Sequence, residues 1–439
     1  MTILRSRNAL RCAYITFRGN PFTEGAKALH YESDGLIVTF NGTIEYAGPW
    51  DASHPLLSDA ALVHYPNALV VPGFIDTHVH YPQMQIIGAY GAQLIDWLNT
   101  YTFVAEQRYA DLGYAQGVAN IFIDELLRVG TTTAAVYCTV HPNSVQAFFE
   151  AASKRDMRMI AGKVLMDRNA PDALLDTAQS GYDDSQALIN AWHGKGRLHY
   201  AITPRFAPTS SPAQLEAAGA LWKANPSTYM QTHLSENLDE VAWVKSLFPG
   251  QNGYLDVYDH FGLVGPRALF GHAIHVHEPE WQRLADTHAS VTHCPTSNLF
   301  LGSGLFDFAR TCEPASGQAA VRTGLATDVG AGTSLSMLRS MGEAYKVGQL
   351  GGYSLSSVKA FYLATRGAAN ALHLDHCIGS IEAGYDADLV VLDRQSTPLL
   401  KFRDSYCNSI EEVMFVLMTL ADDRAVKAVY TGGSLASPT

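Results

Sequence analysis

The chain has 439 residues, of which 47% are hydrophobic and 16% are charged, so it can bury a large core and is neither disordered nor fibrous. Its 42 acidic residues outnumber its 30 basic residues, and no dense basic cluster occurs along the chain. A surface that follows nucleic-acid phosphates is therefore excluded, and a small neutral or cationic ligand suits this charge better.

The first predicted element is a β-hairpin, because strand-like residues at 34–40 and 42–48 flank an Asn41-Gly42 pair that is typical of a tight turn. A second β-rich part comes late, at residues 378–393 and 424–435, where glycines interrupt strand-like runs. Neither end of the chain makes a credible core alone. We therefore expect both ends to pair into one small β domain.

Between the two ends, short apolar or β-branched runs alternate with longer helical patterns, which is typical of parallel strands joined by crossover helices. The runs are residues 69–79, 131–137, 158–166, 198–203, 228–232, 268–270, 289–292 and 324–326. Eight such units predict a barrel whose active site lies at the carboxyl ends of the strands.

The predicted fold is therefore an α/β protein with a TIM-type (β/α)₈ barrel and a small β-sandwich domain formed from both chain ends. We place the barrel at residues 70–374 and the β domain at residues 1–69 and 375–439.

The six cysteines are far apart and form no C-x-x-C pair, so neither a disulfide framework nor a structural zinc knuckle is expected. The first residues lack the apolar core of a signal peptide, and no run approaches the ~18 apolar residues of a membrane helix. We expect a soluble cytoplasmic protein that binds neither membranes nor nucleic acids.

Polar residues that favour metals follow several of the predicted strands. His78 and His80 end the first strand on one face, while His233, His272 and Asp328 end the fifth, sixth and eighth. Each alone is more often a hydrogen-bonded rim residue than a ligand. Convergence of three histidines and an aspartate on one barrel mouth nevertheless predicts a divalent metal site, for which Zn²⁺ is the commonest choice.

At these residues the chain resembles the amidohydrolase superfamily, through His78-Val79-His80, the later histidines, Asp328 and the segment 384–390. Within the superfamily it is similar to the branch that deaminates guanine. That narrower resemblance rests on residues 76–83, 88–91, 97–103, 203–206, 294–298 and 327–333.

The resemblance implies one Zn²⁺ per subunit, with Fe²⁺ as an alternative, and a homodimer. The implied ligands are His78, His80, His233 and Asp328. Glu236 is implied as the proton shuttle, because a carboxylate near both metal and substrate can move protons between water, ring and leaving amine. Asp328 could accept the second proton of the water, which makes it both ligand and catalyst.

The resemblance also places His272 close to the substrate, where it could orient the attacking water or stabilise developing charge. His275 and His277 compete for this role, since both follow closely. The position of His272 directly after the sixth strand favours it, and the other two are expected to be loop residues.

Gln83 and Arg205 are the predicted readers of the substrate, because an amide and an arginine fork together match the polar edge of guanine. Arg205 could instead balance an acidic mouth. Phe206 could pack on the base or only fill the barrel top, and His233 is expected to lie near the substrate as well.

The segment 88–103 carries Leu94, Trp97, Leu98 and Tyr101 at helical spacing. We interpret Leu94 and Leu98 as a buried helical stripe, whereas Trp97 is expected to cover the pocket. Lys163 lies on the third predicted strand, and the fourth ends without a lysine, so a second metal bridged by a modified lysine is not expected.

The predicted function is zinc-dependent hydrolysis of guanine to xanthine and ammonia in purine catabolism, with a small purine base as the ligand. Two alternatives stay open. One is deamination of another heterocycle, such as cytosine or an amino-triazine, because few contacts set substrate choice. The other is a non-catalytic scaffold on the same barrel.

Overall fold

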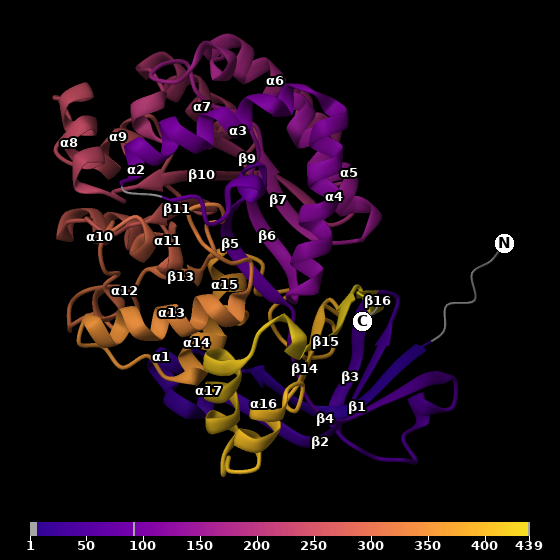
Figure 1. Ribbon diagram of the computed structural model, residues 1–439. Helices are drawn as coiled ribbons and strands as arrows, with labels where there is room; N and C mark the ends of the chain where they lie inside the picture. The colour runs from indigo at the N-terminus through magenta and orange to yellow at the C-terminus, as the bar shows by residue number, and fades with distance from the viewer. Residues whose placement is uncertain (1–6, 91–92, 438–439) are drawn as a thin grey trace.

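The protein was analysed as a computed structural model that describes residues 7–90 and 93–437. Gly91 of the motif at 88–91 and residues 1–6 of the N-terminus lie outside the described residues. The chain forms a barrel surrounded by helices, with a sheet from both chain ends beside it (Figure 1).

Eight parallel strands form the barrel, which confirms the predicted fold class. They are β5 (Phe74–His80), β6 (Thr131–Tyr137), β7 (Arg158–Gly162), β9 (Leu198–Pro204), β10 (Tyr229–Leu234), β11 (Ala268–His272), β12 (Ser290–His293) and β13 (Arg322–Leu325). A short strand, β8 (Val164–Leu165), pairs with β9. The first and last strands meet where Thr77 Oγ1 donates to Leu325 O at 2.9 Å.

The first predicted strand, at residues 69–79, is wrong in its extent. Residues 69–72 belong to β4 (Ala60–Pro72) of the other sheet, and Gly73 separates them from β5. The Gly73 N–H donates to Asp388 O at 2.8 Å, and a Cβ at this glycine would lie 2.1 Å from Thr132 Oγ1. Two strands that are buried in different cores read as one apolar run, because side-chain hydrophobicity does not show where a chain changes sheets.

Helices follow the strands and cover the outside of the barrel. After β5 come α2 (Leu94–Trp97), α3 (Phe103–Glu106) and α4 (Leu112–Arg128), and later connections carry α5 (Pro142–Lys154), α6 (Ala178–Trp192), α7 (Pro212–Ala224), α8 (Leu238–Leu247), α9 (Tyr254–His260), α10 (Glu278–Asp286), α11 (Pro295–Phe300), α12 (Phe308–Cys312), α13 (Met337–Leu350), α14 (Ser357–Leu363) and α15 (Arg366–Ala371). None of the helices in the described part of the chain is both long and apolar enough to cross a lipid bilayer.

The strands of the two chain ends hydrogen-bond into one seven-stranded sheet in the order β16-β15-β14-β4-β1-β2-β3. Besides β4, its members are β1 (Arg7–Phe17), β2 (Leu29–Phe40), β3 (Thr43–Pro49), β14 (Leu389–Asp393), β15 (Val426–Thr431) and β16 (Ser434–Ser437). The predicted hairpin turn is present at Asn41 and Gly42, which both have positive φ angles. Beside this sheet lie α1 (Pro21–Glu24), α16 (Pro398–Asp404) and α17 (Ile410–Leu420) (Figure 1).

Partly buried ion pairs connect this sheet to the amino-terminal end of the barrel. Arg197, directly before β9, donates through Nη1 to both carboxylate oxygens of Asp388 at 2.8 Å. Arg158 at the start of β7 donates to Asp386 Oδ2 at 2.6 Å. These contacts lie at the end of the barrel opposite to the carboxyl ends of the strands, where the candidate site is found.

Candidate active site

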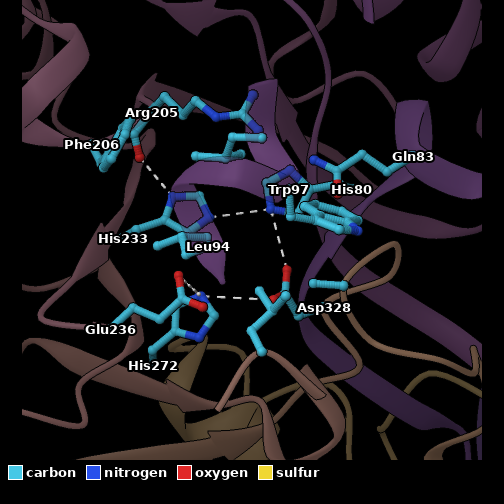
Figure 2. Close-up of a pocket in the computed structure, with 13 residues that line it drawn as sticks. His80, Gln83, Leu94, Trp97, Arg205, Phe206, His233, Glu236, His272 and Asp328 are labelled. Carbon is cyan, nitrogen blue, oxygen red and sulfur yellow. Dashed lines mark hydrogen bonds and ion pairs between the residues drawn. The ribbon is translucent and has the colours of Figure 1, made fainter. Parts of the chain in front are cut away.

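A pocket lies at the carboxyl ends of the barrel strands (Figure 2). Its walls are formed by His80, Gln83, Leu94, Trp97, Leu98, Arg205, Phe206, His233, Glu236, His272, Leu301, Asp328 and Ala331. The structure thus brings together all the predicted site residues, with His78 directly beside the pocket in contact with His80 and Asp328.

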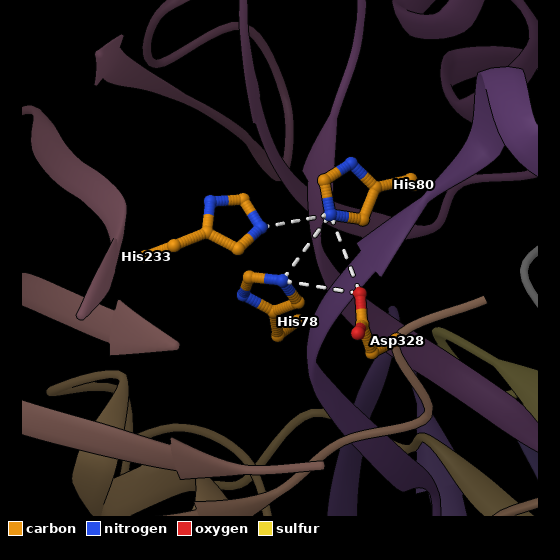
Figure 3. A group of neighbouring side chains, drawn as sticks. All are labelled: His78, His80, His233 and Asp328. Atoms are coloured by element: carbon orange, nitrogen blue, oxygen red, sulfur yellow. Dashed lines mark hydrogen bonds and ion pairs between the residues drawn. The ribbon is translucent and has the colours of Figure 1, made fainter. Parts of the chain in front are cut away.

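Four of these side chains direct their ligand atoms at one point (Figure 3). The ligand atoms of His78, His80, His233 and Asp328 all lie within 4.8 Å of one another. The Nε2 atom of His80 lies 3.3 Å from His78 Nε2 and 3.2 Å from His233 Nε2. Asp328 Oδ1 lies 3.3 Å from the Nε2 atoms of both His78 and His80.

The protonation of this group suits a divalent cation. Burial lowers the pKa of His78, His80 and His233, so the imidazoles are neutral near pH 7. Although burial opposes it, hydrogen bonds from His78 and His80 hold the pKa of Asp328 well below its usual range. Three neutral imidazoles and a carboxylate are a donor set that fits Zn²⁺ or Fe²⁺.

The ring of His233 is oriented by the chain itself. Its Nδ1 lies 2.6 Å from the carbonyl oxygen of Arg205, which can only accept, so Nδ1 carries the proton. The lone pair of Nε2 then points into the ligand cluster. A backbone carbonyl behind the outer ring nitrogen is the usual support of a metal-binding histidine.

The backbone turns sharply where the strands reach the pocket. Ser235 after β10, His272 at the end of β11 and Asp328 after β13 all have positive φ angles, of 49°, 69° and 48°. Non-glycine residues adopt this conformation rarely, and such residues cluster at functional sites. The turn at Ser235 directs Glu236 back over the barrel mouth, close to His233.

Glu236 lies beside the ligand cluster but is not one of its four members. Its Oε1 accepts a hydrogen bond from Ser303 Oγ at 3.2 Å, and its Oε2 lies 3.5 Å from His272 Nε2. Its main-chain N–H donates to Glu240 Oε2 at 2.8 Å, which fixes the start of α8. Burial and, secondly, the charge of Asp328 raise the pKa of Glu236 to about 8, so this carboxyl can hold or release a proton near neutral pH.

Of the three neighbouring histidines, His272 lines the pocket. Its Nδ1 lies 2.8 Å from Asn298 Oδ1, which leaves Nε2 facing Glu236 and, at 3.7 Å, Asp328 Oδ2. His275 contacts Ser303 O at 2.8 Å, and His277 is the N-cap residue directly before α10. Both lie in loop positions outside the pocket.

Gln83 and Arg205 lie at the same pocket and share a partner that the sequence did not reveal. Glu106, at the end of α3, accepts from Gln83 Nε2 at 3.1 Å and from Arg205 Nη1 at 3.0 and 2.8 Å. Gln83 Oε1 in turn accepts from the Gly330 N–H at 3.1 Å. Glu106 thus gives Arg205 a negatively charged partner inside the protein. Balancing the acidic residues at the barrel mouth is therefore not the only interaction of Arg205.

Aromatic and apolar side chains complete the walls, and Figure 2 shows Trp97 and Phe206 on different sides of the pocket. The predicted helical segment exists as α2, a π-helical turn η4 (Leu98–Thr102) and α3. The interpretation of Leu94 and Leu98 as core residues only is wrong, because both are buried and also line the pocket. An apolar stripe cannot show whether it faces a core or a ligand.

Lys163 is placed away from the ligand cluster. It follows β7, the third barrel strand, and its ammonium group pairs with the buried Asp176. The fourth strand, β9, ends at Pro204 without a lysine. A further group of possible ligands joins Cys294 and His272 to His78 and Asp328, but burial raises the pKa of the Cys294 thiol well above its usual range. A buried thiol in this state is a poor ligand.

Sequence reasoning missed Glu106, Asn298 and Ser303. Glu106 lies three residues beyond the segment 97–103, and Asn298 ends the segment 294–298, so both were within reach of the motifs. Their roles depend on which side chains they meet across the barrel mouth, which a linear pattern does not contain.

The family comparison matches the amidohydrolase family over residues 69–436. Among curated proteins, the chain is 52% identical to the guanine deaminase of Escherichia coli K12 over 413 residues, which cover 94% of this chain and 93% of that protein. It is 38% identical to the probable guanine deaminase of Deinococcus radiodurans, over 93% and 94% of the two chains.

Solved structures give the same result. The structure of E. coli guanine deaminase is similar with a TM-score of 0.95 and 50% identity, over 98% of this chain and 99% of that one. Guanine deaminase from C. acetobutylicum, a structure with guanine bound in the active site, is similar with a TM-score of 0.88 and 28% identity, over 98% and 99%.

Proposed function

The chain belongs to the amidohydrolase family and is a hydrolase that deaminates guanine, and from this premise we propose how its residues bind the metal and the base. The observation that carries the proposal is the convergence of a four-residue ligand group, a free carboxyl and a fixed Gln83–Glu106–Arg205 array on one pocket.

His78, His80, His233 and Asp328 would hold one Zn²⁺ per subunit. The fit is supported by their converging atoms, by the neutral imidazoles and by the carbonyl behind His233. When bound, Zn²⁺ supplies a Lewis acid that brings the pKa of a water molecule to ~7. Fe²⁺ suits the same donors, so the metal content of the purified protein decides between them.

Glu236 is the proton carrier in this proposal. It takes a proton from the attacking water as the C2–O bond forms, passes it to a ring nitrogen, and then supplies a proton to the amino group as the C2–N bond breaks. Asp328 takes the second proton of the water and returns it to Glu236, and this is the proton that Glu236 supplies to the amino group. Guanine and water thereby give xanthine and ammonia, and the raised pKa of Glu236 supports both directions of transfer.

His272 positions the attacking water at C2. Its buried Nε2 has no hydrogen-bond partner among the described residues, and it faces the space between Glu236 and Asp328. Asn298 holds the ring through Nδ1 at 2.8 Å. Because Asn298 Oδ1 accepts from Nδ1, Nε2 carries the lone pair and can accept a hydrogen bond from the attacking water, which fixes the position of the water for attack.

Gln83 and Arg205 bind the polar edge of the base. Arg205 can donate to the carbonyl oxygen of guanine, and Gln83 can exchange hydrogen bonds with the adjacent ring atoms. Trp97 and Phe206 enclose the faces of the ring system, and His233 contacts it from the metal side. All of these residues line the pocket.

The test is an absorbance assay of guanine, adenine, cytosine and an amino-triazine, run beside a measurement of metal content. We expect guanine alone to be consumed rapidly, with about one zinc per chain. A preference for cytosine or the triazine would contradict the proposed substrate contacts of Gln83 and Arg205. A protein that takes up no zinc and converts none of the four would support the scaffold alternative.

We also propose that the enzyme is a cytoplasmic homodimer. The six cysteines are all unpaired, which suits a reducing compartment. The dimer rests on the resemblance to the family, and light scattering of the purified protein tests it: the mass of a monomer would contradict this part of the proposal.

A further inference from the structure

Glu106 contacts two proposed substrate residues but has no role of its own in the steps described so far, and it is absent from the residues that line the pocket. Glu106 is completely buried, and its two partners, Gln83 and Arg205, are also buried. The carboxylate oxygens lie 2.8 and 3.0 Å from Arg205 Nη1, and Oε1 lies 3.1 Å from Gln83 Nε2. A buried charge pair of this kind is held because removing either partner leaves the other uncompensated.

This carboxylate fixes which way the Gln83 amide points. A carboxylate only accepts hydrogen bonds, so the Gln83 NH₂ group must face Glu106. The Gly330 N–H only donates, so Gln83 Oε1 must face it, at 3.1 Å. Both neighbours require the same orientation of the Gln83 amide, which cannot flip without losing two hydrogen bonds. One N–H and one lone pair of the amide remain for a ligand.

Arg205 is held in the same way. Nη1 is occupied by Glu106, and the guanidinium group lies over the Phe103 ring with its central carbon 5.6 Å from the ring centroid. Phe103 and Glu106 are the two ends of the short helix α3. One helical turn therefore fixes the guanidinium group by a charge and by a ring face, and the remaining N–H groups stay available to a ligand.

We propose that Glu106 is a positioning residue that gives the enzyme its preference for a purine with a carbonyl oxygen and a neighbouring ring N–H. The inference rests on the proposed substrate roles of Gln83 and Arg205. The fixed array offers arginine donors for the carbonyl oxygen and a glutamine acceptor for the ring N–H. 2-Aminopurine keeps the reacting amino group but lacks both partners, so it cannot use the array.

The decisive variant is Glu106→Gln, which keeps the size of the side chain and removes its charge. The new amide can turn its NH₂ group toward Gln83, and an NH₂ group does not accept a hydrogen bond. The Gln83 amide then loses its fixed orientation and is free to flip. We expect the KM for guanine to rise ~10- to 100-fold with a smaller change in kcat, as expected for a hydrogen bond to a charged group. The inhibition constant of 2-aminopurine should change less than about threefold.

Two further variants separate positioning from a general structural role. Asp176→Asn breaks the buried Lys163–Asp176 pair, which does not line the pocket, and should lower thermal stability without changing the KM for guanine. Glu106→Asp keeps the charge and should recover part of the guanine preference. It also serves as the test if Glu106→Gln does not fold.

A double-mutant cycle completes the experiment. If Glu106 acts through Gln83, the loss in Glu106→Gln/Gln83→Ala is clearly smaller than the product of the two single losses. Independent losses would overturn the inference, and so would an equal weakening of guanine and 2-aminopurine. Failure of the unmodified enzyme to convert guanine would instead overturn the proposed function, so the two failures are distinguishable.

Discussion

At the scale of single residues, the position of Glu236 separates proton transfer from metal binding. Ser303 holds one of its carboxylate oxygens, and the other faces His272. Burial of the group, followed by the charge of Asp328, raises its pKa to about 8. A carboxyl in this state can act as both acid and base at neutral pH.

Glu236→Gln is expected to keep the metal and lose nearly all turnover. The amide preserves the hydrogen bond to Ser303 but cannot carry a proton, so kcat should fall at least ~100- to 10,000-fold. Steady-state kinetics and metal analysis of the same sample measure both properties. Ser303→Ala is the matched control, with a much smaller loss. A kcat close to that of the unmodified enzyme would remove Glu236 from the mechanism.

His293 is a second residue whose protonation has a measurable consequence, here for stability. Its ring packs against Phe306 and Phe308, with centroid distances of 4.4 and 5.1 Å, and within residues 7–90 and 93–437 neither ring nitrogen has a hydrogen-bond partner. Burial and, secondly, the charge of His272 lower its pKa from 6.5 to about 3. The folded protein therefore keeps this imidazole neutral over most of the acidic range.

The pH dependence follows from the proton balance. Between pH 6.5 and 3 the unfolded chain binds a proton at His293 and the folded chain does not, so the free energy of unfolding falls as the pH falls. From pH 7 to pH 5 this residue alone lowers it by about 2 kcal/mol. Urea titrations should show that His293→Leu loses about 2 kcal/mol less over this interval than the unmodified protein. Equal losses in the two proteins would contradict the prediction.

At the scale of elements, the segment after β5 makes one side of the pocket in three short helical pieces. α2, η4 and α3 follow one another, and the π-helical turn between them shifts the faces of the two helices. Trp97 and Leu98 thereby line the pocket, while Glu106 reaches Arg205 from behind it. The wall and the support of the substrate residues thus belong to the same segment.

Trp97→Ala is expected to open this side of the pocket. The indole is buried and lines the pocket. In the proposed binding mode its loss should raise the KM for guanine about 10-fold and change kcat less, because binding of the ring face is lost in ground and transition states alike. Val104→Ala is the control, since Val104 lies in the same segment but is 61% exposed. Equal effects of the two variants would show that the segment acts only through its stability.

How far the elements were predictable depends on what each pattern contains. All eight barrel strands were placed, because each is a short apolar run and its length is set by burial on both faces. The first predicted strand included residues of β4, because the chain changes sheets at Gly73 while the residues on both sides of it are apolar. The histidines and Asp328 at the strand ends follow from the two-residue period and the barrel geometry.

The contacts of Glu106 and Asn298 could not be predicted in this way. Each lies on a helix and contacts a residue at the end of a barrel strand, across 99 and 26 positions of sequence. Their partners are set by the packing of loops over the barrel mouth, which has no repeat in the sequence. The faces of Leu94 and Leu98 were assigned to the core for the same reason.

At the scale of the whole molecule, the proposed metal ligands join strands from distant parts of the barrel. His78 and His80 lie on β5, His233 on β10 and Asp328 follows β13. The first and the last strand meet at this point, where the Asp328 N–H also donates to His78 O at 2.9 Å. A bound ion would hold the barrel closed at the carboxyl ends of its strands.

Removal of the metal should therefore lower the melting temperature as well as the activity. An ion present at a thousand times its Kd adds about 4 kcal/mol to the free energy of unfolding. Calorimetry before and after chelation, and after Zn²⁺ is restored, measures the change. His80→Asn should melt at the same temperature with and without added Zn²⁺. An unchanged melting temperature in the chelated unmodified protein would argue against a firmly held ion.

The opposite end of the barrel joins the two parts of the molecule through charge rather than metal. The side chain of Arg197 is 12% exposed and that of Asp388 is 4% exposed, and their atoms lie 2.8 Å apart. Asp388 belongs to the segment 384–390 that resembles the family, and Arg197 leads into β9. This pair is therefore one of the contacts that join the sheet of the chain ends to the barrel.

Arg197→Met is expected to lower the free energy of unfolding by about 3–5 kcal/mol, because the Asp388 carboxylate stays buried without its partner. The pair lies at one end of β9 and the pocket at the other end. Because the two are separated by the length of the strand, kcat and KM should stay within about twofold. Arg283→Met removes an exposed pair with Asp259 and should cost less than about 1 kcal/mol. Chemical denaturation followed by tryptophan fluorescence compares the two variants. Similar losses in both would show that burial of the Arg197 pair contributes nothing to the joining of sheet and barrel.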